Sequence, residues 1–226
     1  GVGEVLVAPY NDLAATQATW GQPVAGRYHG AEVLEHPPNG QGATALLMLA
    51  MLERFGLAAM DPLGAERLHL EAEATRLAYD ARDRLIADPA LTGAAERLAR
   101  MLAPATAARL AGLIDPDRSL GPVAPLTEAI HRDTIYLCVV DRDRTAVSLI
   151  YSIYHSFGSG LASDRFGIAF QNRGAGFTLA EGHPNEAAGG KRPMHTIIPG
   201  MARLPGGGLM PFGVMGGAYQ PAGHAR

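Results

Sequence analysis

The sequence has a single cysteine, Cys138, which excludes both a disulfide framework and a metal site built from cysteines. Cys138 lies within an apolar run, where a thiol is expected to behave as a small buried hydrophobic group. Basic residues are not in excess, because 19 Lys and Arg stand against 22 Asp and Glu and are dispersed along the chain. A nucleic-acid partner, which requires a basic patch, is therefore not expected.

Long apolar segments are also missing. No run approaches about 18 uninterrupted apolar residues, so the sequence predicts no membrane span. His155, His183 and His195 lack the spacing of a known metal site, and we expect neither a metal nor an organic cofactor. What is present, 47% hydrophobic and 18% charged residues in a chain of 226, is typical of a globular protein with a substantial core.

The chain begins Gly1-Val2-Gly3 without a methionine, which is typical of an internal piece of a longer protein. The absence of a signal peptide therefore says little about the compartment. The compartment stays open, with the cytoplasm favoured over the periplasm or secretion.

The first half of the sequence has mainly helical patterns. After a turn rich in proline and glycine, residues 43–55 are apolar on nearly every side, which predicts a helix buried all round. In residues 62–86 apolar side chains recur every three or four positions, and charges of both signs fill the remaining face. We expect an amphipathic helix with a solvated, ion-paired face. Shorter helices are predicted at 94–102 and 105–113, and a short strand at 31–35.

Strand patterns replace helical ones at Thr134. Residues 135–140 are apolar on both alternating faces, which predicts a strand buried between two layers, and a polar turn leads to a second strand at 145–152. Thr134 itself has two interpretations. It is either a strand residue, since threonine favours strands, or a nucleophile that a cut in the chain releases, with its own α-amine as the base. The residues alone leave both open.

Several short motifs follow one another in a fixed order along the chain. They are Pro37-Pro38 with the glycines after them, the helix at 71–88, the strand of Thr134 with Val139-Val140-Asp141, Phe157-Gly158-Ser159-Gly160, Gln171-Asn172, Gly190-Lys191-Arg192-Pro193 and Gly216-Gly217. In this order and spacing they resemble the gamma-glutamyltranspeptidase family of N-terminal-nucleophile hydrolases, over essentially the whole chain. The resemblance implies an α+β fold, the four-layer αββα sandwich, of which this chain is an internal fragment.

The resemblance also implies a precursor that cuts itself between Asp133 and Thr134. Residues 1–133 then form the C-terminal part of the large, helical subunit. Residues 134–226 form the N-terminal part of the small subunit, which carries the nucleophile. The two subunits of such a heterodimer come from one precursor and remain together.

Catalytic positions of the family match residues of this chain. The nucleophile matches Thr134, and the second-strand hydroxyl that assists it matches Ser152, where typical members have threonine. The paired glycines that stabilise the oxyanion match Gly216 and Gly217. This is physically reasonable, since successive amide N–H groups can approach a developing charge only where no side chain intervenes.

Substrate-binding positions depart from the family pattern. Tyr154 stands where glutathione-processing members have an asparagine, and Arg173 replaces a glutamine directly after Asn172. Gly176 replaces the aspartate that receives the α-ammonium of a γ-glutamyl group. An arginine near the place of an ammonium acceptor inverts the local charge, so we expect recognition of a carboxylate. A surface arginine in a glycine turn is the alternative.

His195 and Thr196 replace an adjacent serine pair of the family. A histidine here could act as a general base. Because the mechanism already has the α-amine as its base, a histidine in the pocket wall or in solvent is the simpler interpretation.

These observations predict a self-processing threonine amidohydrolase or acyltransferase. It would act through an acyl-Thr134 intermediate on a small amide that carries a carboxylate, in the manner of the oxamate amidohydrolases among the divergent family members. The first alternative is a γ-glutamyltransferase or hydrolase of glutathione. A further alternative is a non-catalytic binding relative whose precursor never matures.

Overall fold

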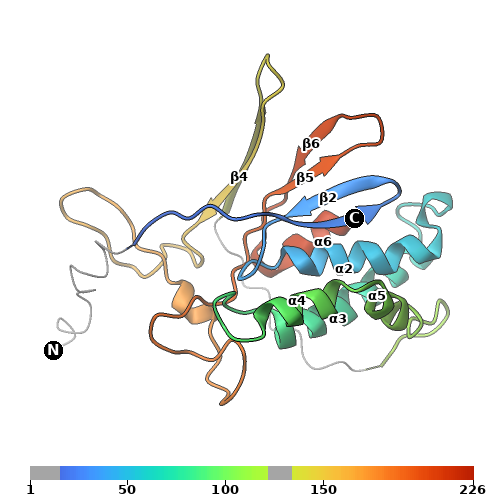
Figure 1. Cartoon of the computed structure of the whole chain (residues 1–226), viewed down its shortest axis with the longest axis horizontal. Coiled ribbons are helices and arrows are strands. Elements are labelled where there is room, and N and C mark those ends of the chain that lie inside the picture. The colour runs from blue at the N-terminus through green and yellow to red at the C-terminus, as the bar shows by residue number, and fades with distance from the viewer. Residues whose placement is uncertain (1–15, 122–133) are drawn as a thin grey trace.

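The computed structural model describes residues 16–121 and 134–226, and a four-stranded antiparallel sheet lies at its centre (Figure 1). The strands stand in the order β1 (Val24–Tyr28), β2 (Ala31–Glu35), β5 (Gly200–Arg203) and β6 (Leu209–Phe212). β1 and β2 form a hairpin whose two turn residues, His29 and Gly30, both have positive φ, as a two-residue turn of this kind requires. The strand predicted at 31–35 is confirmed as β2.

The sheet joins parts of the chain from both sides of Thr134. β1 and β2 precede this residue and β5 and β6 follow it. The junction is the antiparallel pairing of β2 with β5, in which Val33 faces Ala202. The predicted subunit boundary, which stays a prediction, therefore crosses the middle of one sheet.

Helices pack beneath this sheet (Figure 1). They are α2 (Gly42–Leu52), α3 (Ala65–Leu85), α4 (Ala94–Leu102), α5 (Pro104–Ala111) and α6 (Gln220–Ala225). α2 contacts β1 and β2 on one side and α3, α5 and α6 on the others, so all its residues except Ala50 are buried. The prediction of a helix buried all round is confirmed. None of the helices in the described part of the chain combines the length and apolar character that a membrane crossing requires.

The charged face of α3 is ion-paired, as predicted, but its solvation was wrongly predicted. Arg67 pairs with Glu71 at 2.8 Å and Arg76 with Glu73 at 2.7 Å. Glu71, Glu73 and Arg82 are nevertheless buried. The reason is that other segments cover this face: Glu73, for example, accepts hydrogen bonds from the backbone and side chain of residues 119–120.

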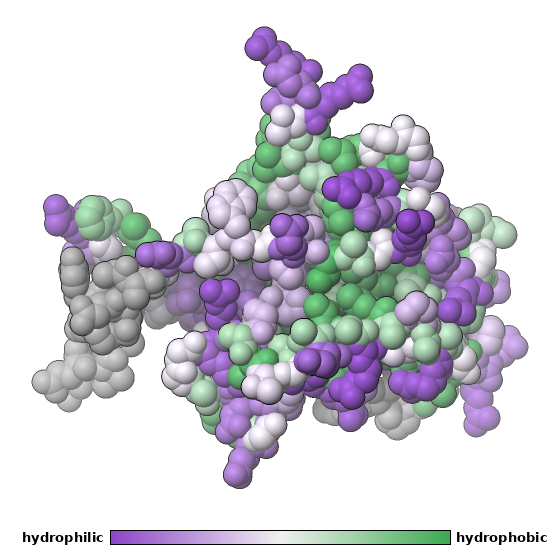
Figure 2. All heavy atoms as spheres, in the orientation of Figure 1, coloured by the Kyte–Doolittle hydropathy of each residue, from purple (hydrophilic) through white to green (hydrophobic). Residues whose placement is uncertain are grey.

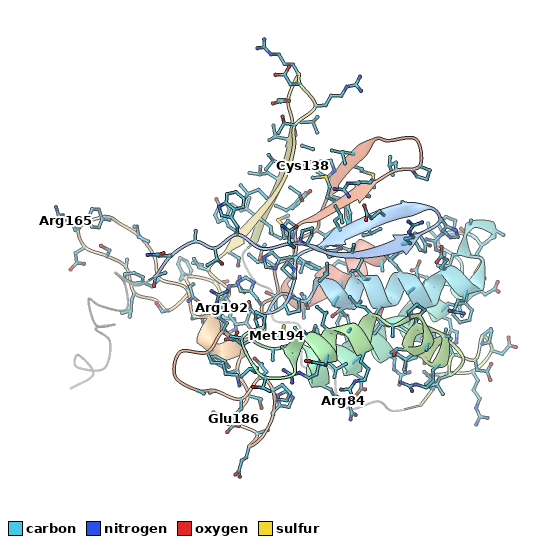
Figure 3. All side chains as sticks on the ribbon, in the orientation of Figure 1. Arg84, Cys138, Arg165, Glu186, Arg192 and Met194 are labelled. Atoms are coloured by element: carbon cyan, nitrogen blue, oxygen red, sulfur yellow. The ribbon has the colours of Figure 1, made fainter. Side chains whose placement is uncertain are left out.

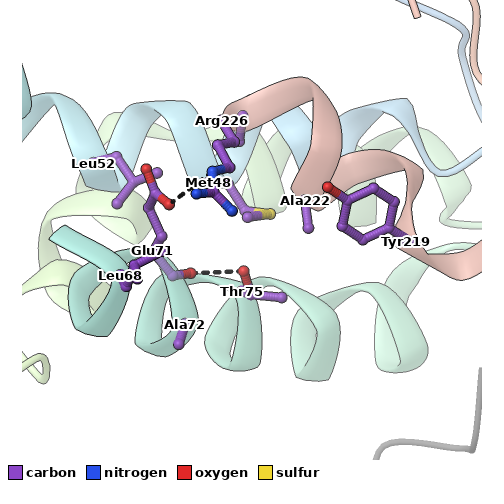
Figure 4. A pocket seen from close by; sticks show the side chains of 10 residues that line it. Met48, Leu52, Leu68, Glu71, Ala72, Thr75, Tyr219, Ala222 and Arg226 are labelled. Carbon is purple, nitrogen blue, oxygen red and sulfur yellow. Dashed lines mark hydrogen bonds and ion pairs between the residues drawn. The ribbon is translucent and has the colours of Figure 1, made fainter. Parts of the chain in front are cut away.

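The short helix α6 packs against α2. A cavity of about 180 Å³ is lined by residues of α2, α3 and α6 (Figure 4). Met48 of α2, Thr75 of α3 and Ala222 of α6 line it, and Arg226 approaches Glu71 at 3.8 Å across its mouth. α6 is thus anchored on the helical layer, and so is the turn directly before it.

β3 (Thr134–Val140) and β4 (Ala146–Ser152) form the predicted hairpin, which projects from the body of the molecule (Figure 1). β4 is attached to β6, because Ser148 Oγ donates a hydrogen bond to the carbonyl oxygen of Phe212 at 3.2 Å.

Much of this hairpin is open to solvent, from its base to its tip. Ile135 is 50% exposed, Val139 is 55% exposed, and the Cys138 thiol is exposed as well (Figure 3). Hydrophobic residues lie below a hydrophilic tip (Figure 2). The predictions of a strand between two layers and of a buried thiol are wrong for this chain. The hairpin is a two-stranded sheet of its own, and no second layer from the described residues covers it.

Candidate active site

Thr134 and Ser152 face each other at the open end of the hairpin. They are directly opposed in the antiparallel register, so their side chains lie on the same face of the two strands. Ser152 Oγ also accepts a hydrogen bond from the N–H of Tyr154 at 3.0 Å. The hydroxyl predicted to assist Thr134 is thus adjacent to it and held in place. Asp133, on the other side of the predicted cleavage bond, lies outside the described residues.

The loop after β4 brings Tyr154 into the interior. Tyr154 is 6% exposed, has a positive φ of 81°, and stacks on His155 with ring centroids 4.5 Å apart. The Asn172 side chain clamps this loop: its Oδ1 accepts from the N–H of His155 at 3.0 Å and its Nδ2 donates to His155 Nδ1 at 2.8 Å. Asn172, predicted to bind substrate, is placed here as a support for Tyr154.

Arg173 connects the end of β4 to Thr196. Its side chain is buried rather than on the surface, with 7% of the residue exposed. Nη1 donates to Thr196 Oγ1 at 3.3 Å and Nη2 to the carbonyl oxygen of Ser152 at 3.4 Å. The guanidinium carbon also lies 5.2 Å from the centre of the Tyr154 ring, within the range of a cation–π contact. The alternative of a surface arginine is excluded.

His195 lies beside this guanidinium with its backbone fixed. Its N–H donates to the carbonyl oxygen of Asn39 at 2.8 Å, and its own carbonyl oxygen accepts from the N–H of Gln41 at 3.1 Å. Burial lowers the pKa of His195 to about 3, and the positive charges of Arg173 and then His36 add to the effect. The imidazole is therefore neutral at pH 7 and a weak base.

The glycine pair forms a turn at the start of a short 3₁₀ helix, Gly217–Tyr219, that leads into α6. Gly216 has φ 125° and Gly217 has φ 59°, conformations that residues with a side chain rarely adopt. The N–H groups of both glycines donate no hydrogen bond to any residue in the described ranges. Two adjacent N–H groups at a helix start, without an internal acceptor, are what a developing oxyanion requires.

Gln41 links the glycine turn to Thr196. Its side chain is fully buried. Nε2 donates to the carbonyl oxygens of Thr196 at 2.6 Å and Gly217 at 2.9 Å, and Oε1 accepts from Arg82 Nη1 at 3.1 Å. A continuous series of contacts therefore runs through the predicted site residues. In order, it passes through Thr134, Ser152, Arg173, Thr196, Gln41 and Gly217.

Sequence reasoning missed Gln41 and Arg82. Gln41 stands in a segment rich in proline and glycine, where a polar side chain is expected to be solvated. Arg82 was counted with the charged face of its helix. A signal was present in the spacing, because Leu70, Ala74, Ala78 and Arg82 follow one another every four residues on one buried stripe.

A cavity of about 390 Å³ lies beside this series of contacts. Tyr154, Gly176 and Thr196 line it together with Ala218, the residue after the glycine pair. Met194, another lining residue, lies between the hairpin and the helices (Figure 3). The cavity has the size of a small-molecule site.

The charges that line this cavity balance each other. Arg82 and Asp83 both reach it, and they are paired with each other at 2.7 Å between Nε and Oδ1. At Gly176 there is little room for a side chain, since a Cβ there would lie 3.2 Å from the carbonyl oxygen of Met194. The carboxylate that glutathione-processing relatives are expected to have at this position is absent.

A sequence model described as Gamma-glutamyltranspeptidase matches residues 8–226 of this chain. The chain belongs to the gamma-glutamyltranspeptidase family. Two curated relatives are the glutathione hydrolase-like YwrD proenzyme of Bacillus subtilis, 35% identical over 213 residues, and the oxamate amidohydrolase proenzyme of Klebsiella pneumoniae, 37% identical over 210 residues. Each alignment covers 93% of this chain, which spans 39% and 38% of the length of these relatives.

The fold of this family member also has a solved counterpart. The crystal structure of a cephalosporin acylase from Bacillus halodurans matches with a TM-score of 0.81 and 34% identity, over 95% of this chain and 38% of the other. The predicted fold class, an α+β fragment of the N-terminal-nucleophile hydrolase fold, is confirmed by this likeness. The resemblance to the gamma-glutamyltranspeptidase family is confirmed as well.

Proposed function

We propose that this chain carries the catalytic centre of a self-processing threonine amidohydrolase or acyltransferase. The observation that supports this most directly is the series of contacts from the opposed pair Thr134 and Ser152 to the glycine turn at Gly216 and Gly217. It joins the predicted nucleophile to predicted oxyanion donors that are far apart in the sequence. The names of the two curated relatives, both proenzymes, are in keeping with a precursor that is cut into a large and a small subunit.

The chemistry follows from the nature of these groups. Once the chain is cut before Thr134, the freed α-amine has a pKa near about 8 and accepts the proton of the threonine hydroxyl. Oγ then forms a bond to the amide carbon, and the negative charge that develops on the amide oxygen is stabilised by the N–H groups of the glycine turn. The C–N bond breaks as the amine leaves with a proton. Water or an acceptor amine then attacks the acyl-Thr134 ester.

The substrate class follows from charge. The Arg82 and Asp83 charges offset each other, His195 is neutral, and Arg173 adds a positive charge beside Thr196. A carboxylate is favoured in such a field, whereas an α-ammonium group is repelled and finds no carboxylate at Gly176. We therefore place a small, carboxylate-bearing amide such as oxamate first. The oxamate amidohydrolase named among the relatives is in line with this choice.

Glutathione hydrolysis is the second candidate function. It is favoured by the volume of the cavity, about 390 Å³, which exceeds what the two-carbon skeleton of oxamate fills. Another relative is named as glutathione hydrolase-like. Charge and volume thus favour different substrates, and the two can be separated by kinetics.

The test uses full-length protein. Intact mass after purification should give two fragments, the smaller beginning with Thr134, and the Thr134→Ala variant should stay uncut. The mature enzyme should then have a higher kcat/KM for oxamate than for a γ-glutamyl anilide. A folded wild-type protein that stays in one piece and inactive would favour the non-catalytic relative instead, and a preference for the anilide would favour the glutathione hydrolase.

A further inference from the structure

The carbonyl groups of the glycine turn are all anchored. The carbonyl oxygen of Gly216 accepts from the N–H of Tyr219 at 3.1 Å, and that of Gly217 accepts from Gln41 Nε2 at 2.9 Å. The Tyr79 hydroxyl, on α3, donates to the carbonyl oxygen of Ala218. Side chains from two distant segments thus hold a turn that two glycines would otherwise leave with wide conformational freedom.

Anchoring a carbonyl also directs an N–H group. In a trans peptide unit the C=O and the following N–H point in opposite directions, and the unit is planar. With the Gly216 and Gly217 carbonyl oxygens held by Tyr219 and Gln41, the N–H groups of Gly217 and Ala218 must point the other way. Like the two glycines, Ala218 donates no hydrogen bond from its N–H to the described residues, and it lines the cavity. The peptide unit held by Tyr219 therefore presents the N–H of Gly217, and the unit held by Gln41 presents the N–H of Ala218.

The orientation of the Gln41 amide is itself set. A guanidinium only donates, so Arg82 Nη1 requires the amide oxygen to face it, and both amide hydrogens are left for Thr196 and Gly217. Arg82 in turn is held by the Asp83 carboxylate and lies 4.3 Å from the centre of the Tyr79 ring. A glutamine here can satisfy all three partners, whereas an apolar residue of the same size satisfies none.

We propose that Gln41 is a positioning residue for the oxyanion turn, with Arg82 fixing the direction of its amide. The inference rests on the proposed function, in which this turn stabilises the transition state. Because Gln41 holds the turn and does not itself line the cavity, it acts on transition-state stabilisation more than on substrate binding. Its loss should lower kcat and leave KM nearly unchanged.

The test compares Gln41→Met and Arg82→Met with wild type in full-length mature protein. Since a small misplacement of catalytic groups can reduce rates by about a hundredfold, we expect kcat to fall about ten- to a hundredfold in Gln41→Met, with KM within about threefold. The kcat of Arg82→Met should also be lower than that of wild type. Hydrogen–deuterium exchange of the Tyr219 and Gln220 N–H groups, which donate to the carbonyl oxygens of Gly216 and Gly217, should become faster in both variants, because the turn loses one of its anchors.

Leu49→Ala is the matched control, since it removes a buried side chain of α2 that takes no part in the hydrogen bonds that hold the turn. At a temperature where all variants are folded, it should lose thermal stability and keep its kcat. A Gln41→Met enzyme with the kcat of this control, or with unchanged exchange at Tyr219 and Gln220, would overturn the inference. If wild type has no activity, the proposed function fails instead, and the exchange rates still decide whether Gln41 orders the turn.

Discussion

His195 should make the folded state sensitive to mild acid. The pKa of its imidazole is about 3 in the folded protein, because the ring is largely buried near Arg173 and His36, and about 6.5 in the unfolded chain. Between these two values only the unfolded chain binds the proton, so the free energy of unfolding decreases as the pH falls below about 6.5 and levels off below about 3. A pH of 5 lies about 1.5 units below the pKa of the unfolded chain, and each unit lowers the free energy of unfolding by about 1.4 kcal/mol. The protein should therefore lose about 2 kcal/mol of stability relative to pH 7.5.

Urea unfolding of full-length protein at pH 7.5 and pH 5 measures this loss. The Thr134→Ala background keeps the chain uncut, and in it His195→Gln should remove about 2 kcal/mol of the pH dependence. Arg173→Gln should remove a smaller part, since burial is the larger cause of the low pKa. If the His195→Gln variant and its parent lose equal stability between the two pH values, the imidazole titrates normally and the electrostatic description of the site is wrong.

Two further predictions concern catalysis. Ser152→Ala should lower kcat about ten- to a hundredfold without loss of fold, because one orienting hydrogen bond beside the nucleophile, about 1.5–3 kcal/mol, is removed; unchanged turnover of mature enzyme would exclude Ser152 from the site. Arg173→Gln should lower overall activity, since the bonds to Thr196 and Ser152 are lost, but raise kcat/KM for a γ-glutamyl anilide relative to oxamate. An unchanged ratio of the two substrates would contradict the charge argument.

Helices and strands with a clear apolar pattern over seven or more residues were predictable from the sequence. The helix at Ala94–Leu102 has the predicted bounds, and the hairpin of β3 and β4 follows from its polar turn. The strands β5 and β6 were not predictable, because each has only four residues and one contains Pro211. Such short strands are formed by their partners in the sheet rather than by their own pattern.

The candidate site was predictable only in part. Thr134, Ser152 and the glycine pair follow from the motifs, and the structure joins them. The roles of Gln41 and Arg82 depend on contacts across more than 100 residues of sequence, from Gln41 to Thr196 and Gly217. No local pattern specifies such partners. The exposure of the hairpin was likewise not predictable, because an apolar strand has the same pattern whether or not another layer covers it.

The pairing of β2 with β5 has a consequence for how the molecule can be assembled. A cut before Thr134 would leave this sheet as the joint between two separate polypeptides, so the chain must pair its strands before the cut. Refolding of the cut protein from urea would then be a second-order reaction that slows on dilution, whereas the uncut Thr134→Ala variant would refold at a rate independent of concentration. The intact bond before Thr134 would thus be needed for the first folding of the chain. Once this bond is cut, the two polypeptides would refold together only with difficulty.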